Sequence, residues 1–344
     1  MEKIRVILWG LGSMGTLAAK IIAEKEGIEV VGAVDTDPRK IGRALSEITG
    51  CAGQEKIIVT GNEDEALAGG ADAALLAVSS FVRDTTEPLK KIIRSGKNAI
   101  TIAEEWAYPW QAAPVEAGEI DRAARASGVT ALGTGVNPGF VLDTLIIALT
   151  GACADVRKIT ARRVNDLSPF GHTVMETQGV GRSPEEFSRG LADGSIVGHI
   201  GFRQSVGMIA ASLGVRLDEV TESIEPIISR TRRKSPRAAV EPGQVAGCSH
   251  RAEGRAGGRP FIVLEHPQQI CPEAEGIETG DFITIEGTPD INVAITPEIP
   301  GGTATAALAV NMIPCVLNAP PGLVTMAELP VPAARLSDFM QFLK

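Results

Sequence analysis

The chain opens with a glycine-rich turn whose spacing suits the binding of a pyrophosphate, Gly10-Leu11-Gly12-Ser13-Met14-Gly15. The first glycine permits a tight turn, the second lets the backbone approach the phosphates, and the third lets a helix pack close to a strand. An apolar run at residues 4–9 precedes the turn, and a helical stretch, a second apolar run and Asp35 follow it. An acid in that place accepts hydrogen bonds from ribose hydroxyls. The pattern predicts a dinucleotide site.

Two adjacent carboxylates, Glu104 and Glu105, follow an apolar stretch at residues 98–102 that we predict to be a strand of the same sheet. The carboxyl end of such a strand lies beside the nicotinamide end of a bound dinucleotide. A carboxylate there can take the proton of a substrate ammonium, which is a poor hydride donor until it is deprotonated. The alternative is that the acids open a helix, where the helix dipole favours them. We expect Glu104, the first acid after the strand, to be the base.

Polar side chains of a second group fall in the later part of the chain. Residues 156–164 alternate like a strand with one wet face, which places Arg163 and Asn165 together and Arg162 on the other face. An arginine facing a substrate suits a carboxylate, but spacing alone favours a surface arginine. His199 stands between glycines in apolar company, and a core histidine and a ligand-binding one are equally open.

The glycine turn and the paired acids must be positioned by strands and helices, which alternate up to about residue 132. Ser79 and Ser80 end one such strand, residues 71–78, where ligand-contacting loops lie. A glycine-rich loop at 133–139, which contains Asn137, marks a boundary, and antiparallel strands are expected over 228–295. We therefore predict an α/β protein with a Rossmann doubly wound parallel sheet, 1–136 plus about 304–344. Residues 137–303 would form a second, α+β domain, to which the family resemblance described below assigns substrate binding and dimerisation.

Composition limits the possible partners. The 344 residues carry a formal charge of −9, which argues against nucleic acid and anionic membranes. The absence of a signal-like or membrane-spanning segment points to the cytoplasm, as do five scattered cysteines that fit reduced thiols. Four residues could in principle bind a metal ion: Cys248, His250, His266 and Cys271. Their spacing does not match that of a common zinc module, and we expect no metal.

Beyond these arguments, the chain resembles the 2,4-diaminopentanoate dehydrogenases and related native amine dehydrogenases. The resemblance covers essentially the whole chain and is carried by the glycine turn and by six further motifs: Ala103-Glu104-Glu105-Trp106-Ala107-Tyr108-Pro109, Gly135-Val136-Asn137-Pro138-Gly139-Phe140, Ala161-Arg162-Arg163-Val164-Asn165-Asp166-Leu167-Ser168-Pro169, Gly198-His199-Ile200-Gly201, Leu264-Glu265-His266-Pro267-Gln268-Gln269 and Glu298-Ile299-Pro300-Gly301-Gly302. It implies oxidation of the 4-amino group of 2,4-diaminopentanoate to 2-amino-4-oxopentanoate, with ammonia released and NAD or NADP reduced. It also implies the reverse reductive amination and a homodimer whose second domain covers the cofactor cleft.

The resemblance also assigns roles to single residues. Glu104 would be the catalytic carboxylate, and Arg163, Asn165, His199 and Glu105 would bind substrate, with Arg163 facing its carboxylate. Trp106 would narrow the pocket. The cofactor would be held by the glycine turn together with the residues Asp35, Arg39, Ser79, Ser80 and Asn137.

Two questions stay open at this level. Asp35 favours NAD because it repels a 2′-phosphate, whereas Arg39 and the nearby Lys40 and Arg43 could accommodate one, so both cofactors are expected. Three other functions share this architecture. A cyclic-imine reductase of the dihydrodipicolinate reductase type would carry a His-His pair with a lysine, and a sugar dehydrogenase would carry a lysine after the fifth strand. Neither feature is present. The paired acids argue against a dinucleotide sensor without turnover.

Overall fold

The computed structural model describes residues 3–344, which fold into two units. The first unit joins Met1–Phe140 to Pro300–Lys344, and the second is Val141–Ile299. The predicted domain limits lie within a few residues of these. Within residues 3–344, no helix has the length and apolar character needed to cross a membrane.

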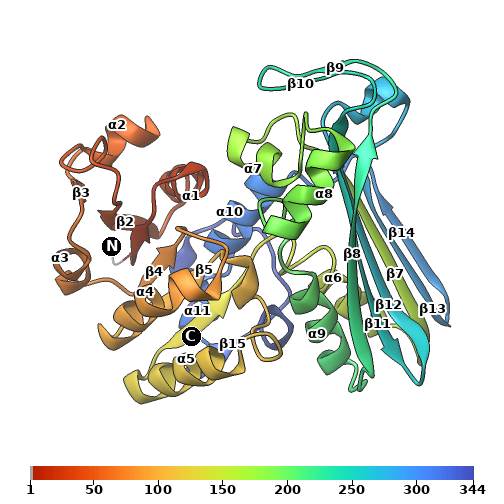
Figure 1. Ribbon diagram of the computed structural model, residues 1–344. Helices are drawn as coiled ribbons and strands as arrows, with labels where there is room; N and C mark the ends of the chain where they lie inside the picture. The colour runs from red at the N-terminus through yellow and green to blue at the C-terminus, as the bar shows by residue number, and fades with distance from the viewer. Residues whose placement is uncertain (1–2) are drawn as a thin grey trace. The chain divides into compact units, whose positions relative to one another are not determined.

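The first unit is built on a seven-stranded parallel sheet (Figure 1). The spatial order of its strands is β15-β6-β5-β4-β1-β2-β3. Their bounds are β1 (Ile4–Trp9), β2 (Ile28–Val34), β3 (Val59–Thr60), β4 (Ala73–Leu76), β5 (Asn98–Thr101), β6 (Thr130–Gly133) and β15 (Gly322–Val324). From β1 the next strands are added toward one edge of the sheet, and from β4 they are added toward the other edge. The strand order therefore reverses between β1 and β4. That reversal is where doubly wound sheets bind ligands, and it confirms the predicted Rossmann architecture.

Helices connect these parallel strands. They are α1 (Ser13–Ala23), α2 (Leu45–Thr49), α3 (Glu63–Ala68), α4 (Val82–Arg94), α5 (Pro114–Ser127), α10 (Gly301–Asn311) and α11 (Ile313–Leu317). Helix α1 packs against α10, and α4 packs against α5. Crossovers between parallel strands are right-handed. Helices between strands that are added toward one edge of the sheet therefore cover one face, and helices between strands that are added toward the other edge cover the opposite face.

The second unit is a six-stranded sheet of order β14-β13-β7-β12-β11-β8. Its strands are β7 (Asp155–Asp166), β8 (Glu219–Ile228), β11 (Val245–Ala256), β12 (Arg259–Gln269), β13 (Gly280–Thr288) and β14 (Ile291–Ile295). The helices α6 (Thr144–Thr150), α7 (His172–Thr177), α8 (Pro184–Asp193) and α9 (Phe202–Ser212) lie on one side of it (Figure 1). The strands within 228–295 pair antiparallel with one another, as expected, whereas β12 also runs parallel to β7, which lies outside that range. Three helices and four strands intervene between β7 and β12, which is the long connection that a parallel pair requires.

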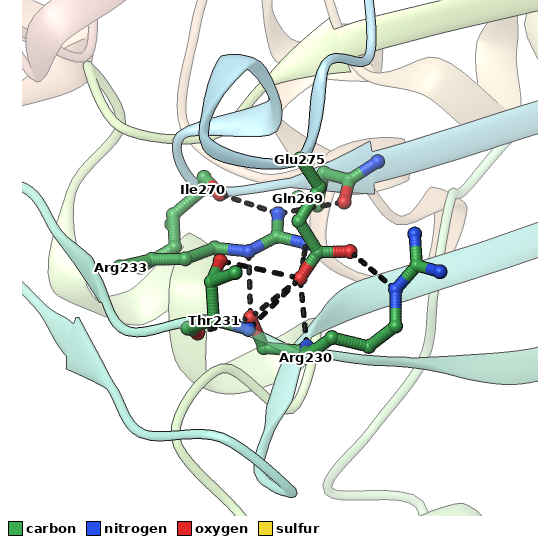
Figure 2. Close-up of polar contacts among 7 residues, drawn as sticks. Arg230, Thr231, Arg233, Gln269, Ile270 and Glu275 are labelled. Carbon is green, nitrogen blue, oxygen red and sulfur yellow. Dashed lines mark hydrogen bonds and ion pairs between the residues drawn. The ribbon is translucent and has the colours of Figure 1, made fainter.

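A short hairpin, β9 (Arg233–Lys234) and β10 (Ala239–Val240), is anchored to this sheet by a buried arginine (Figure 2). Arg233 donates from Nε to Ser229 Oγ at 2.7 Å and from Nη1 to Gln269 Oε1 at 2.7 Å. Its Nη2 lies 3.0 Å from Oε1 of Glu275. Burial alone would raise the pKa of Glu275, but the N–H of Arg230 and the Arg233 charge lower it to about 2. Arg233 thus ties the hairpin to Gln269, the last residue of β12, and to Glu275 in the turn that follows.

Candidate functional site

The glycine turn has the shape that a dinucleotide pyrophosphate requires. Gly10 has a φ of +95°, and a Cβ there would lie 2.4 Å from the carbonyl oxygen of Ala77. A Cβ on Gly15 would lie 1.8 Å from the Gly10 oxygen, so only glycine lets α1 start this close to the turn. A Cβ on Gly12 would meet nothing within 4 Å, and no side chain caps α1. Open space in front of uncapped N–H groups is an anion site, so the residues present fit the phosphates.

Asp35, at the end of β2, holds the glycine turn in place. Its Oδ2 accepts from the N–H of Leu11 at 2.7 Å and from Lys40 Nζ at 2.9 Å, and its Oδ1 accepts from the N–H of Asp37 at 2.8 Å. Burial would raise the pKa of Asp35, but these partners outweigh it and lower that pKa. The carboxylate is therefore ionised beside the turn, with Lys40 compensating part of its charge.

Arg39 is held by an acid of its own loop. Its Nε donates to Asp37 Oδ1 at 2.9 Å and its Nη2 to Asp37 Oδ2 at 2.8 Å, while its side chain is 87% exposed. Hydrogen bonds from Arg39 lower the pKa of Asp37 to about 2. A cation that could contact a 2′-phosphate is thus engaged by Asp37 in this structure.

The two serines after β4 shape the turn into α4. Ser79 donates from Oγ to Asp84 Oδ2 at 2.6 Å and accepts from the N–H of Phe81 at 3.3 Å. The Ser80 carbonyl accepts from the N–H of Glu105 at 3.2 Å, and the Ser80 side chain hydrogen-bonds to Glu104. The loops after β4 and β5 are therefore joined at the carboxyl edge of the sheet.

Glu104 begins the 3₁₀ turn Glu104–Trp106 directly after β5, as the sequence predicts. Burial raises the pKa of Glu104, and the negative charge of Glu105 adds to that effect. Hydrogen bonds from its own backbone N–H and from Ser80 act in the opposite direction and are outweighed. A carboxylate whose pKa is raised is a stronger base than an ordinary glutamate.

Glu105 caps the helix α4. Its Oε2 accepts from the backbone N–H of Val82 at 2.6 Å, at the start of α4. The N-cap residue of α4, Phe81, offers no side-chain hydrogen bond, so Glu105 supplies the cap from another loop. The helix interpretation of the paired acids therefore applies to Glu105, although the helix it stabilises is α4. Its contact with substrate stays a prediction.

Two further residues named from the sequence lie in this unit. Trp106 is fully buried in the core, and its Nε1 donates to Thr85 Oγ1 at 2.8 Å. It packs against the sheet, so the expectation that it narrows a pocket is wrong. Asn137 precedes a cis-proline in the loop after β6, and the N–H of the neighbouring Val136 donates to Thr305 Oγ1 at 3.1 Å. Its contact with cofactor stays a prediction.

In the second unit, Arg163 lies on the buried face of β7, with 2% of its side chain exposed. The surface-arginine alternative is therefore wrong. Its Nη1 donates to Asp281 Oδ1 at 2.6 Å and its Nη2 to the carbonyl of Ile299. Burial raises the pKa of Asp281 in spite of the Arg163 charge. The expected partner of a substrate carboxylate thus already has a protein carboxylate beside it.

Asn165 and His199 belong to a cluster of polar and aromatic side chains on the same face. Asn165 Oδ1 lies 3.0 Å from His266 Nε2, and the His266 and His199 rings meet edge to face at 4.8 Å. The His199 Nε2 atom is buried without a hydrogen-bond partner among the described residues. Burial, together with the Arg163 charge, lowers the pKa of His199 to about 3, so the imidazole is neutral. That nitrogen can hydrogen-bond to a ligand.

The sequence assigned no role to His266 or Asp281. His266 lies in Leu264-Glu265-His266-Pro267-Gln268-Gln269, one of the motifs that carry the family resemblance. Asp281 stands directly opposite Arg163 in the β13–β7 ladder. Alternation along residues 259–269 could have placed His266 on an inward face. Nothing local in the sequence marks Asp281 as the partner of Arg163.

Known proteins resemble this chain over almost its whole length. A family model described as the 2,4-diaminopentanoate dehydrogenase C-terminal domain matches residues 140–344. A 2,4-diaminopentanoate dehydrogenase of Acetoanaerobium sticklandii is 45% identical over 98% of this chain and 97% of its own. An amine dehydrogenase of Streptomyces virginiae is 26% identical over 95% and 96%. The structure of an amine dehydrogenase from Mycobacterium smegmatis matches with a TM-score of 0.86 and 28% identity, over 97% of this chain and 98% of that one.

Proposed function

Because the chain belongs to the 2,4-diaminopentanoate dehydrogenase family, we propose that it oxidises the 4-amino group of 2,4-diaminopentanoate. The products are 2-amino-4-oxopentanoate, ammonium, the reduced dinucleotide and one proton, and one water is consumed. The reverse direction is the reductive amination of a ketone. The observation that carries this proposal is Glu104, a carboxyl group of raised pKa at the end of β5, in the unit that holds the glycine turn.

We assign the proton transfers to Glu104. Its carboxylate takes a proton from the substrate ammonium, which leaves a free amine lone pair that drives hydride departure from the same carbon. The nicotinamide ring of a bound cofactor supplies the hydride acceptor. Glu104 then releases the ammonium proton to solvent. The deprotonated carboxylate accepts the proton lost by the water that attacks the iminium carbon, and returns it to the nitrogen of the carbinolamine, which breaks down to the ketone and ammonium. The glycine turn and Asp35 would hold the pyrophosphate and the ribose, with Ser79, Ser80 and Asn137 contributing from neighbouring loops.

We assign the amino-acid end of the substrate to the second unit. His199 offers an unpartnered Nε2, Asn165 a buried amide, and Arg163 a positive charge. Glu105 is proposed as a further contact to the substrate ammonium. We also propose that the protein acts in the cytoplasm, where its five cysteines, which form no disulfide in the described chain, stay reduced, and that it acts as a homodimer.

The proposal is tested by absorbance at the reduced-nicotinamide band, with purified protein, 2,4-diaminopentanoate and NAD or NADP in separate cuvettes. An increase that requires the diamine is expected. Ammonia release in the same samples should match it mole for mole. Demonstrated nucleotide binding without turnover of the diamine, of other amines or of ketone and ammonia would overturn the proposal in favour of a sensor or an imine reductase.

We propose that both NAD and NADP serve, and that Asp37 weakens the binding of NADP by engaging Arg39. In Asp37→Ser, Arg39 is free to contact a 2′-phosphate. The Kd for NADP should fall about two- to fivefold, the equivalent of one exposed ion pair, while the Kd for NAD stays unchanged. Quenching of tryptophan fluorescence measures both. In the control Asp37→Ser/Arg39→Met the gain should disappear, and a gain that persists would exclude Arg39 as its cause.

A further inference from the structure

The peptide group between Gly198 and His199 is held from both sides by side chains. The Gly198 carbonyl accepts from Gln178 Nε2 at 2.7 Å, and the His199 N–H donates to His250 Nδ1 at 3.1 Å. Gly198 has a φ of +61°, and a Cβ there would lie 3.0 Å from His250 Nδ1. The backbone can therefore approach the His250 ring only because residue 198 is a glycine. The two hydrogen bonds fix the direction in which the His199 side chain leaves the backbone.

The acceptor role of His250 defines its tautomer. Because Nδ1 accepts a backbone N–H, the neutral ring carries its hydrogen on Nε2. Nε2 lies 3.1 Å from Oε2 of Glu222, so the hydrogen on Nε2 faces a carboxylate oxygen. Burial would raise the pKa of Glu222, but His250 and Arg203 hold it below its ordinary value. An ionised Glu222 therefore faces the N–H of His250 and favours this tautomer.

Glu222 also connects His250 to the helix that follows His199. Its Oε1 lies 2.6 Å from Nε of Arg203, in the first turn of α9. His250 itself stands on β11 opposite His266, with Phe202 edge-on to its ring at 4.9 Å. Glu222 and His250 therefore hold both the His199 peptide and the start of α9 against the sheet.

We propose that His250, held by Glu222, is a positioning residue that directs the His199 imidazole toward the substrate. This inference rests on the assignment of His199 to substrate binding. His199 Nε2 has no hydrogen-bond partner within residues 3–344. The His199 ring packs edge to face on Phe202 and His266, and the bond to His250 fixes the backbone from which that ring projects. His250 acts through His199 and need not touch the substrate.

Two substitutions separate this role from simple packing. His250→Asn keeps an acceptor oxygen in the place of Nδ1, whereas His250→Leu removes the acceptor and keeps similar bulk. His250→Leu should raise the KM for the amine about tenfold with kcat changed less than about threefold, the effect of one lost hydrogen bond on binding. His250→Asn should stay within about twofold of the wild type, and the Kd for the dinucleotide should not change in either. Equal KM values for the two variants, high or low, would overturn the proposal.

A second measurement keeps the test independent of activity and of the folding of His250→Leu. The chain has four histidines, so a nitrogen-15 histidine spectrum of the wild-type protein resolves each ring, and His250→Asn identifies the signal of His250. We expect an unprotonated Nδ1 and a protonated Nε2 for His250. The opposite tautomer refutes the positioning role even in an active enzyme. If the wild-type protein has the expected tautomer but turns over no amine, the proposed function is refuted instead.

Discussion

Replacing Glu104 by glutamine is expected to lower kcat by about 10²- to 10⁴-fold, the range for loss of a general base. Glutamine keeps the shape of the side chain and cannot accept the ammonium proton. The Kd for the dinucleotide should stay unchanged because the glycine turn and Asp35 are intact. Steady-state kinetics with the diamine and a fluorescence titration with the nucleotide measure the two effects separately.

The pH profile supplies the control for this prediction. A base works when deprotonated, so kcat/KM should fall as the pH drops through the pKa of Glu104, and burial moves that fall to a higher pH than for an ordinary glutamate. Glu105→Gln can still cap α4 through its amide oxygen. It removes the neighbouring charge, so the acid limb should move to lower pH. Near-normal turnover in Glu104→Gln would remove Glu104 from the mechanism.

Replacing Arg163 by methionine is expected to lower the free energy of unfolding by about 3–5 kcal/mol, the cost of leaving one partner of a buried ion pair uncompensated. The Asp281 side chain is fully buried, 2.6 Å from Arg163 Nη1, and its Oδ2 accepts from the N–H of Ile299 at 2.9 Å. Urea unfolding of the two proteins measures the difference. A loss below about 1 kcal/mol, typical of an exposed pair, would contradict the structural role of Arg163.

The double variant Arg163→Met/Asp281→Asn then tests whether Arg163 also binds the substrate carboxylate. Asparagine keeps the oxygen that accepts from Ile299 and removes the buried charge, so most of the lost stability should return. If Arg163 binds the carboxylate, KM in the double variant should rise much more for the diamine acid than for a simple amine. An equal rise of KM for both substrates would mean that Arg163 forms the ion pair and does not bind the substrate carboxylate.

The positions of the first-unit elements followed from local patterns. The strands β1 and β2 have the predicted bounds, because apolar runs that end at a glycine turn or an acid have few other ways to fold. Helix α4 starts at Val82, after an N-cap residue that offers no side-chain hydrogen bond. Its first turn depends on Glu105, which lies beyond the next strand, so no pattern near Val82 could have indicated it.

The sequence by itself determined the family, the dinucleotide fold, the glycine turn with Asp35, and the carboxylate pair after β5. These depend on spacing along one segment, which the chain carries wherever the rest folds. Only the tertiary structure buried Glu104 and Trp106, directed Glu105 to the start of α4, and paired Arg163 with Asp281. The reason is physical: desolvation and the compensation of a buried charge depend on which strands become neighbours, and Asp281 is 118 residues from Arg163 in the chain.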